Sequence, residues 1–176
     1  KNAGRRVKEC ELVQKDGIYH MDFDSYDAQM TGSETMLILC SPHNPSGRLW
    51  TKQELSKLAA FAKRHELLII SDEIHHDIIF PGKQHHPMPL AAPDCLDRLI
   101  LLTAPSKTFN IAGNHDGNVI IQDEMLRAKF HANMLALGVS STLFGTAMTT
   151  AAYSPEGAAW VDDMRAYIAD NARIFD

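Results

Sequence analysis

The sequence is poor in cysteine and has no long hydrophobic run, and both absences narrow the class of protein. Three cysteines occur in 176 residues, at Cys10, Cys40 and Cys95. An odd and widely spaced set of this kind is not a disulfide framework, and it favours a reducing cytoplasm. No apolar run approaches the roughly 20 residues that a membrane helix needs, and no signal-peptide pattern opens the chain. We therefore expect a cytoplasmic protein without a membrane partner.

An excess of positive charge is also missing. The chain has 17 Lys and Arg against 22 Asp and Glu, a formal net charge of -5, and its acidic residues are scattered. This balance gives no basic surface for nucleic acid or anionic lipid, so neither is expected as a partner. With 45% hydrophobic and 22% charged residues, the composition is that of a globular domain with a substantial core.

Short apolar runs alternate with helical patterns along the chain. The runs at 36–41, 67–71 and 98–103 indicate buried strands. Between the first two, Thr51 and Glu54 form a capping-box signature for a helix over about 52–65. Further strands are expected at 6–13 and 118–121, and further helices at 22–30, 123–137, 142–153 and 157–174. The pattern predicts an α/β fold with a mainly parallel sheet flanked by helices, although an antiparallel direction stays open for 118–121.

Polar residues follow each of the three buried strands. Asn44 comes after the first, Asp72 to His75 after the second, and Ser106 with Lys107 after the third. In parallel sheets, functional groups collect just past the carboxyl ends of the strands. Burial of an ammonium group costs several kcal/mol unless it is paired or used chemically. Lys107 is therefore a candidate for chemistry, and we expect it to face a mostly apolar cleft that favours its neutral, nucleophilic form.

Each of these signals has a plainer alternative. Asp72 could cap a helix whose first turn is acidic, and Lys107 could serve as a structural ion-pair partner. Asn44 before Pro45 is an ordinary turn dipeptide, and turn chemistry also accounts for Ser106. No metal site is expected, because two adjacent histidine pairs ten residues apart match no ligand spacing.

Taken together, three segments resemble a known family. SPHNPSGRLWT, ISDEIHHDIIF and APSKTFNIAG are similar to the signature segments of the class I/II, fold-type-I pyridoxal-phosphate enzymes. More narrowly, they resemble the carbon–sulfur lyase subgroup, the MalY/PatB-type cystathionine β-lyases. The resemblance implies a three-layer large domain, of which residues 1–176 would be the C-terminal half. The N-terminal part and the small domain would then be absent, and such a chain should expose apolar surface.

The resemblance also implies roles for individual residues. Lys107 corresponds to the lysine that forms a Schiff base with pyridoxal 5′-phosphate and then moves the proton at the substrate Cα. Asp72 corresponds to the partner of the pyridine nitrogen. Asn44 corresponds to the residue that hydrogen-bonds the ring 3-oxygen, and His75 occupies the place where many relatives carry a tyrosine near that oxygen.

The phosphate contacts implied by the family are only partly present. A serine three residues before the lysine and an arginine eight after it often bind the phosphate in aminotransferases. Here these positions are Ala104 and His115, and the alanine fits the lyase subgroup. Ser106 is the remaining candidate for a phosphate contact.

The leading hypothesis is a carbon–sulfur lyase that cleaves cystathionine or cysteine S-conjugates by α,β-elimination. The alternatives are an aminotransferase that uses a 2-oxo acid and a non-catalytic, pyridoxal-phosphate-binding regulator. The resemblance further implies a small amino-acid substrate and a homodimer, with the present piece inactive alone. The stretch HANMLALG, residues 131–138, is expected in a core or an interface.

Overall fold

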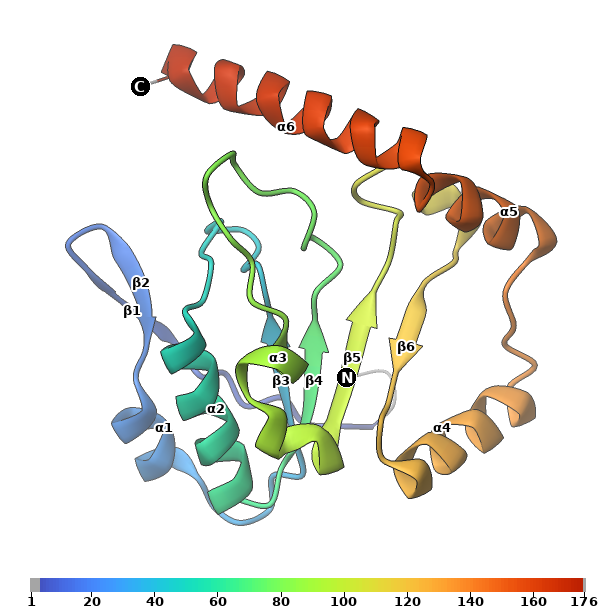
Figure 1. Cartoon of the computed structure of the whole chain (residues 1–176). Helices are drawn as coiled ribbons and strands as arrows, with labels where there is room; N and C mark the ends of the chain where they lie inside the picture. The colour runs from blue at the N-terminus through green and yellow to red at the C-terminus, as the bar shows by residue number, and fades with distance from the viewer. Residues whose placement is uncertain (1–3, 176) are drawn as a thin grey trace.

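A four-stranded sheet forms the centre of the computed structural model, which describes residues 4–175 (Figure 1). Its strands lie in the order β3 (Met36–Cys40), β4 (Leu68–Asp72), β5 (Leu99–Thr103) and β6 (Asn118–Ile120). The first three are parallel, and β6 runs antiparallel to β5. The predicted α/β fold with a mainly parallel sheet is confirmed, and the direction left open for the fourth strand is antiparallel.

The register of the parallel strands places their carboxyl ends at one level. Cys40 lies opposite Asp72, and Asp72 lies opposite Leu102. Two backbone hydrogen bonds continue this pairing beyond the strands: the Ser41 N–H donates to the Asp72 carbonyl, and the Glu73 N–H donates to the Leu102 carbonyl, both at 2.9 Å. The three connections that carry the candidate site residues therefore leave the sheet from the same edge.

Helix α2 (Lys52–Arg64) covers one face of the sheet and begins where the sequence predicts. The Thr51 hydroxyl accepts a hydrogen bond from the Glu54 N–H at 3.2 Å, and the Glu54 carboxylate accepts one from the Thr51 N–H at 2.8 Å. Leu55 and Phe61 on its apolar side are fully buried in the core. The same core includes residues of α1 (Phe23–Gln29), α3 (Met88–Ala91) and the 3₁₀ helix η1 (Pro93–Arg98).

Three helices complete the C-terminal part. They are α4 (Glu124–Ala136), α5 (Leu143–Ala152) and α6 (Pro155–Phe175), and they match the predicted helices to within about two residues. The short 3₁₀ helix η2 spans Ala112–Asn114. Helix α6 passes above the carboxyl ends of the strands (Figure 1). Within residues 4–175, no helix combines the length and the apolar character that a bilayer crossing requires.

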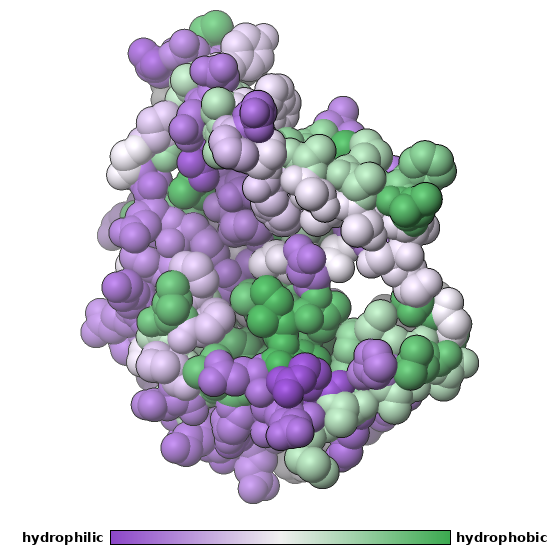
Figure 2. Space-filling model, turned by 45° about the vertical axis from the view of Figure 1, so that its right-hand side comes forward, coloured by the Kyte–Doolittle hydropathy of each residue, from purple (hydrophilic) through white to green (hydrophobic). Residues whose placement is uncertain are grey.

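The expected exposed apolar surface is present. Ile38 on β3 is 71% exposed. Leu143 and Phe144 at the start of α5 are 83% and 76% exposed. Figure 2, turned toward the side of β6 and α4, shows apolar side chains gathered on this face. Leu135 and Leu137 of the HANMLALG stretch are also exposed, so this stretch is not a core element of the described chain.

The prediction of a strand at 6–13 is wrong in its extent. The structure has a hairpin in which β1 (Leu12–Lys15) pairs with β2 (Ile18–Met21). Asp16 and Gly17 at its tip have φ values of 51° and 76°, which suit the left-handed two-residue turn that matches strand twist. Strand β2 was not predicted, because its four residues carry too little pattern.

Candidate active site

The three segments predicted to carry the site meet at the carboxyl edge of the sheet. Asp72 is the last residue of β4 and is partly buried. Asn44 lies four residues beyond β3, and Lys107 lies four residues beyond β5; both are exposed. The strand register thus brings together segments that are 28 and 35 residues apart in the sequence.

Backbone bonds hold the Asn44 segment. The His43 N–H donates to the Arg48 carbonyl at 2.9 Å, and the Gly47 N–H donates to the His43 carbonyl at 2.7 Å. The Asn44 N–H donates to the Cys40 thiol sulfur at 3.3 Å, and the Asn44–Pro45 peptide bond is cis. The ordinary-turn alternative is thus correct for the backbone, while the Asn44 side chain borders a cavity.

This cavity has a volume of about 240 Å³ and lies between the Asn44 segment and His75. Its other lining residues are Pro42, His43, Pro45, Gly47 and Ile78. The His75 Nδ1 atom is buried and has no hydrogen-bond partner within residues 4–175. Buried polar atoms in native proteins are nearly always paired, so His75 is a candidate contact for a bound group.

The chain after β4 turns rather than continuing as a helix, so the helix-cap alternative for Asp72 is wrong. Residues 74–77 form a turn in which the Ile78 N–H donates to the His75 carbonyl at 2.9 Å. The Asp72 carboxylate accepts one long hydrogen bond, at 3.4 Å, from the Ile74 N–H. Most of its hydrogen-bonding capacity is therefore available to a ligand.

The adjacent acid, Glu73, is buried and hydrogen-bonded within the protein, unlike Asp72. It is 2% exposed. One carboxylate oxygen accepts hydrogen bonds from the Ser71 hydroxyl at 2.8 Å and the Met88 N–H at 2.9 Å. The other lies 2.7 Å from His85 Nε2. This pair anchors the loop of residues 73–88 and accounts for one of the histidines that the sequence left unexplained.

Glu73 was not recognised as an important residue in the sequence. Glu73 could have been identified from the alternation of side chains along an extended segment, because neighbouring side chains point to opposite faces. If Asp72 faces the site, Glu73 must face the interior and needs donors there. Its partners could not be identified, because His85 and Met88 lie 12 and 15 residues away along an irregular loop.

Lys107 lies on a turn that follows β5. The Phe109 N–H donates to the Pro105 carbonyl at 2.9 Å, and the Ile111 N–H donates to the Ser106 carbonyl at 3.0 Å. Ser106 is partly buried. The expected apolar cleft around Lys107 is not formed by residues 4–175, because the turn projects beyond the sheet and its lysine is exposed. The neighbouring Thr108, in contrast, is 3% exposed.

The segment after this turn binds α5. The Asp116 carboxylate accepts a hydrogen bond from the Thr149 hydroxyl at 3.0 Å. A Cβ atom at Gly145 would lie 2.9 Å from the Asp116 Cβ, so this position needs glycine for the helix to approach. Within residues 4–175, no group of three His, Cys, Asp or Glu residues could hold a metal ion.

Comparison with known proteins agrees with this geometry. Residues 1–176 match the family described as aminotransferase class I and II. The chain belongs to this family. It is 39% identical to cystathionine beta-lyase PatB of Bacillus subtilis over 170 residues, which cover 96% of this chain and 44% of PatB. It is 34% identical to protein MalY of Escherichia coli, covering 90% of this chain and 40% of MalY.

Solved structures support the fold as well. Cystalysin from Treponema denticola superposes with a TM-score of 0.91 at 38% identity, covering 99% of this chain and 44% of cystalysin. The pyridoxal-phosphate-bound C–S lyase from Staphylococcus hominis superposes with a TM-score of 0.84 at 35% identity, covering 93% and 41%. The predicted fold type and the similarity to the MalY/PatB subgroup are confirmed. The chain spans less than half the length of these relatives.

We predict that Glu73→Ala strongly destabilises the protein. Its removal leaves the Ser71 hydroxyl, the Met88 N–H and the His85 ring without their buried acceptor, which should cost about 3–5 kcal/mol of the free energy of unfolding. Chemical denaturation measures this loss. The control, Glu9→Ala at an exposed position, should change stability by no more than about 0.5 kcal/mol. Equal effects of the two substitutions would contradict the buried network.

Proposed function

We propose that residues 1–176 are the C-terminal half of the cofactor-binding large domain of a pyridoxal-phosphate-dependent carbon–sulfur lyase. The reaction is α,β-elimination from cystathionine or cysteine S-conjugates. The observation that carries the proposal is the convergence of the Asn44, Asp72 and Lys107 segments at one sheet edge, beside the cavity that Asn44 and His75 line. The similarity to PatB, cystalysin and the Staphylococcus hominis lyase supports the choice of reaction.

The residues at this edge fit pyridoxal 5′-phosphate. Asn44 and His75 line a concave space with an unpaired buried nitrogen, and Asp72 offers a carboxylate with little protein bonding. The group needs an amine to bind its aldehyde, which Lys107 offers from an exposed position. When bound, pyridoxal phosphate withdraws electrons from the substrate Cα and so makes its proton acidic.

The residues at this edge would divide the work between them. Lys107 would hold the cofactor through its amine and would serve as the base for the proton at the substrate Cα. The Asp72 carboxylate would pair with the pyridine nitrogen and favour its protonated form. Asn44 and His75 would hold the ring 3-oxygen, and Ser106 would contribute a hydroxyl to the phosphate.

The rest of a longer protein must complete this site. Lys107 is exposed in the described chain, whereas proton abstraction by an amine is favoured when water is excluded. We propose that the missing parts cover it and bind the small amino-acid substrate. We also place the protein in the cytoplasm, because its three cysteines are free thiols in the structure.

An aminotransferase is the second candidate. Glutamate-pyruvate aminotransferase AlaA of Escherichia coli is 30% identical over 132 residues, which cover 75% of this chain and 32% of AlaA. Lys107, Asp72 and Asn44 would do the same work in both reactions. The lyase is favoured because the relatives with higher identity over more of the chain include PatB and cystalysin.

A homodimer is part of the proposal. Leu143 and Phe144, at the start of α5, are strongly exposed. Exposed apolar side chains of this size mark surfaces that another chain segment covers. We assign them to the contact with a second copy of the full-length protein.

Lys107→Ala and Lys107→Arg should each abolish covalent binding of pyridoxal phosphate in the full-length protein. Neither side chain can form the carbon–nitrogen double bond that borohydride reduces. Peptide mass spectrometry after reduction should find the cofactor on Lys107 in the wild-type protein and in Lys83→Ala, a control at an exposed loop lysine. Retention of the reducible adduct in Lys107→Ala would overturn the site assignment.

The choice between the two reactions is tested with L-cystathionine. Elimination consumes one water and yields pyruvate, ammonia and homocysteine, so the full-length protein should release pyruvate and a free thiol in equal amounts. We expect this rate to exceed amino transfer to a 2-oxo acid at least about tenfold. The reverse ratio would establish the aminotransferase, and loss of both activities in Lys107→Ala would assign them to the same site.

Leu143→Glu should weaken self-association of the full-length protein by about tenfold or more, because it places a charge in a desolvated contact. Sedimentation at several protein concentrations measures the dissociation constant. Leu90→Glu is the matched control, since Leu90 is 77% exposed on α3 at another part of the surface. If the two variants associate equally well, the start of α5 is not the interface.

A further inference from the structure

A polar contact outside the predicted site joins three elements beneath the Lys107 turn. The Thr108 hydroxyl donates a hydrogen bond to the Asp77 carboxylate at 3.2 Å. The Asp77 backbone carbonyl accepts a hydrogen bond from Arg165 Nε of α6 at 2.6 Å. Asp77 therefore connects the segment after β4 with the turn after β5 and with α6.

The partial burial of Asp77 and the burial of Thr108 strengthen the hydrogen bond between them. Asp77 is only partly exposed, and Thr108 is buried next to Lys107 in the sequence. A hydroxyl that donates to a carboxylate away from bulk water forms a charge-assisted bond. The Thr108 hydroxyl would otherwise be a buried polar group without an acceptor, which is unfavourable.

Charged and titratable groups face Asp77 from two other elements and from its own segment. His76 Nε2 lies 3.5 Å from the Asp77 carboxylate, and Arg165 approaches from α6. Tyr153, at the end of α5, has a raised pKa, first because of burial and then because of the Asp77 negative charge. The Asp77 carboxylate thus contacts Thr108 and His76, while Arg165 holds the backbone carbonyl of the same residue.

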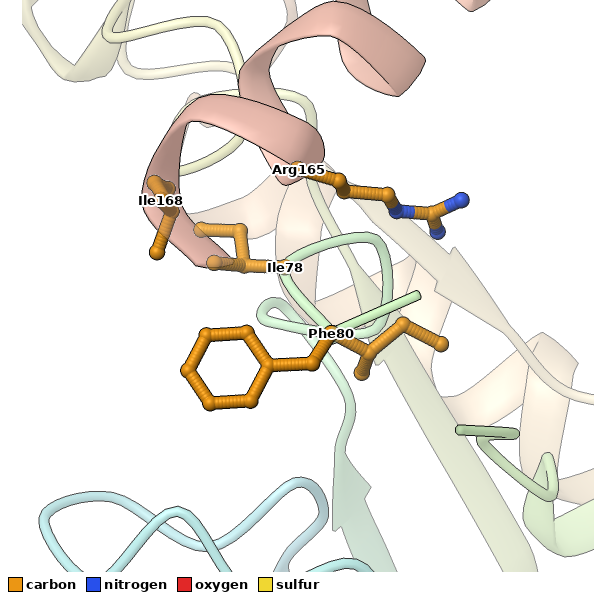
Figure 3. Close-up of a pocket in the computed structure, with 5 residues that line it drawn as sticks. Ile78, Phe80, Arg165 and Ile168 are labelled. Carbon is orange, nitrogen blue, oxygen red and sulfur yellow. The ribbon is translucent and has the colours of Figure 1, made fainter. Parts of the chain in front are cut away.

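Packing of α6 restricts the Asp77 segment further. Figure 3 shows Arg165 and Ile168 of α6 over Ile78 and Phe80 of the segment after β4. These side chains enclose a small apolar space of about 20 Å³. Ile78, which follows Asp77, therefore packs against α6. His75, two residues before Asp77, lines the candidate cofactor cavity.

We propose that Asp77 is a positioning residue for Lys107. Its carboxylate holds Thr108, and through Thr108 it restrains the turn that carries Lys107. The assignment rests on the proposed function for the meaning of Lys107, but its physical content, a turn held by Asp77, is independent of any cofactor. Asp77 itself touches neither substrate nor cofactor in this scheme.

Amide hydrogen exchange of the full-length, cofactor-free protein tests the restraint directly. The Phe109 and Ile111 amides close the Lys107 turn and should exchange at least about tenfold faster in Asp77→Ala and in Thr108→Val. Thr108→Ser keeps the donor and should exchange like wild type. The control, Asp123→Ala, removes the bond that the Leu126 N–H donates at the start of α4, and it should leave these two amides unchanged.

A double-mutant cycle separates the contact from general destabilisation. If Asp77 acts through Thr108, the combination Asp77→Ala with Thr108→Val should open the turn no more than either substitution alone. Multiplicative effects, or unchanged amides in both single variants, would overturn the proposal.

Cofactor binding supplies a second readout. The rate at which added pyridoxal phosphate forms the borohydride-reducible adduct on Lys107 should fall about tenfold in Asp77→Ala. It should stay at the wild-type value in Thr108→Ser, which keeps both the hydroxyl donor and Asp77. A wild-type protein without the adduct refutes the proposed function, while the exchange data still decide the role of Asp77. An adduct that forms at the wild-type rate in Asp77→Ala refutes the positioning role alone.

Discussion

The parallel pairing of β3, β4 and β5 is the constraint on which the site depends. Cys40, Asp72 and Leu102 lie opposite one another, and the hydrogen bonds from Ser41 and Glu73 extend the pairing past the strand ends. A shift of one strand by one residue would turn Asp72 to the other face of the sheet. The loops that follow can therefore be irregular while their starting points remain accurately placed.

Asp72 and Glu73 are neighbours in the chain, and side chains alternate along an extended segment, so the two acids face opposite sides. Glu73 faces the interior and has its hydrogen-bonding capacity occupied by Ser71, Met88 and His85. Asp72 faces the carboxyl edge with one long bond. An aspartate at a strand end is better restrained than one in a loop, which suits the role proposed for Asp72. The buried glutamate supports this arrangement by holding the next connection against the core.

The described chain forms only part of the surroundings expected for Lys107. Its turn is held by backbone bonds and by the Thr108–Asp77 contact, yet the amine itself is exposed. The described chain thus restrains the turn that carries Lys107 but does not remove the lysine from water. Exposed apolar residues on β3 and α5 agree with a chain that spans less than half the length of its relatives.

The sequence by itself determined most of the elements and the choice of candidate site residues, because these depend on local signals. Periodicity located the parallel strands, the Thr51–Glu54 pair marked the start of α2, and the three polar segments after the strands carried the family resemblance. Only the tertiary structure decided the antiparallel direction of β6, the β1–β2 hairpin and the exposure of Lys107. It alone paired Glu73 with His85 and Asp77 with Thr108 and Arg165. Such contacts join residues 12 to 88 positions apart, and their geometry depends on how irregular loops pack, for which the chain carries no repeating pattern.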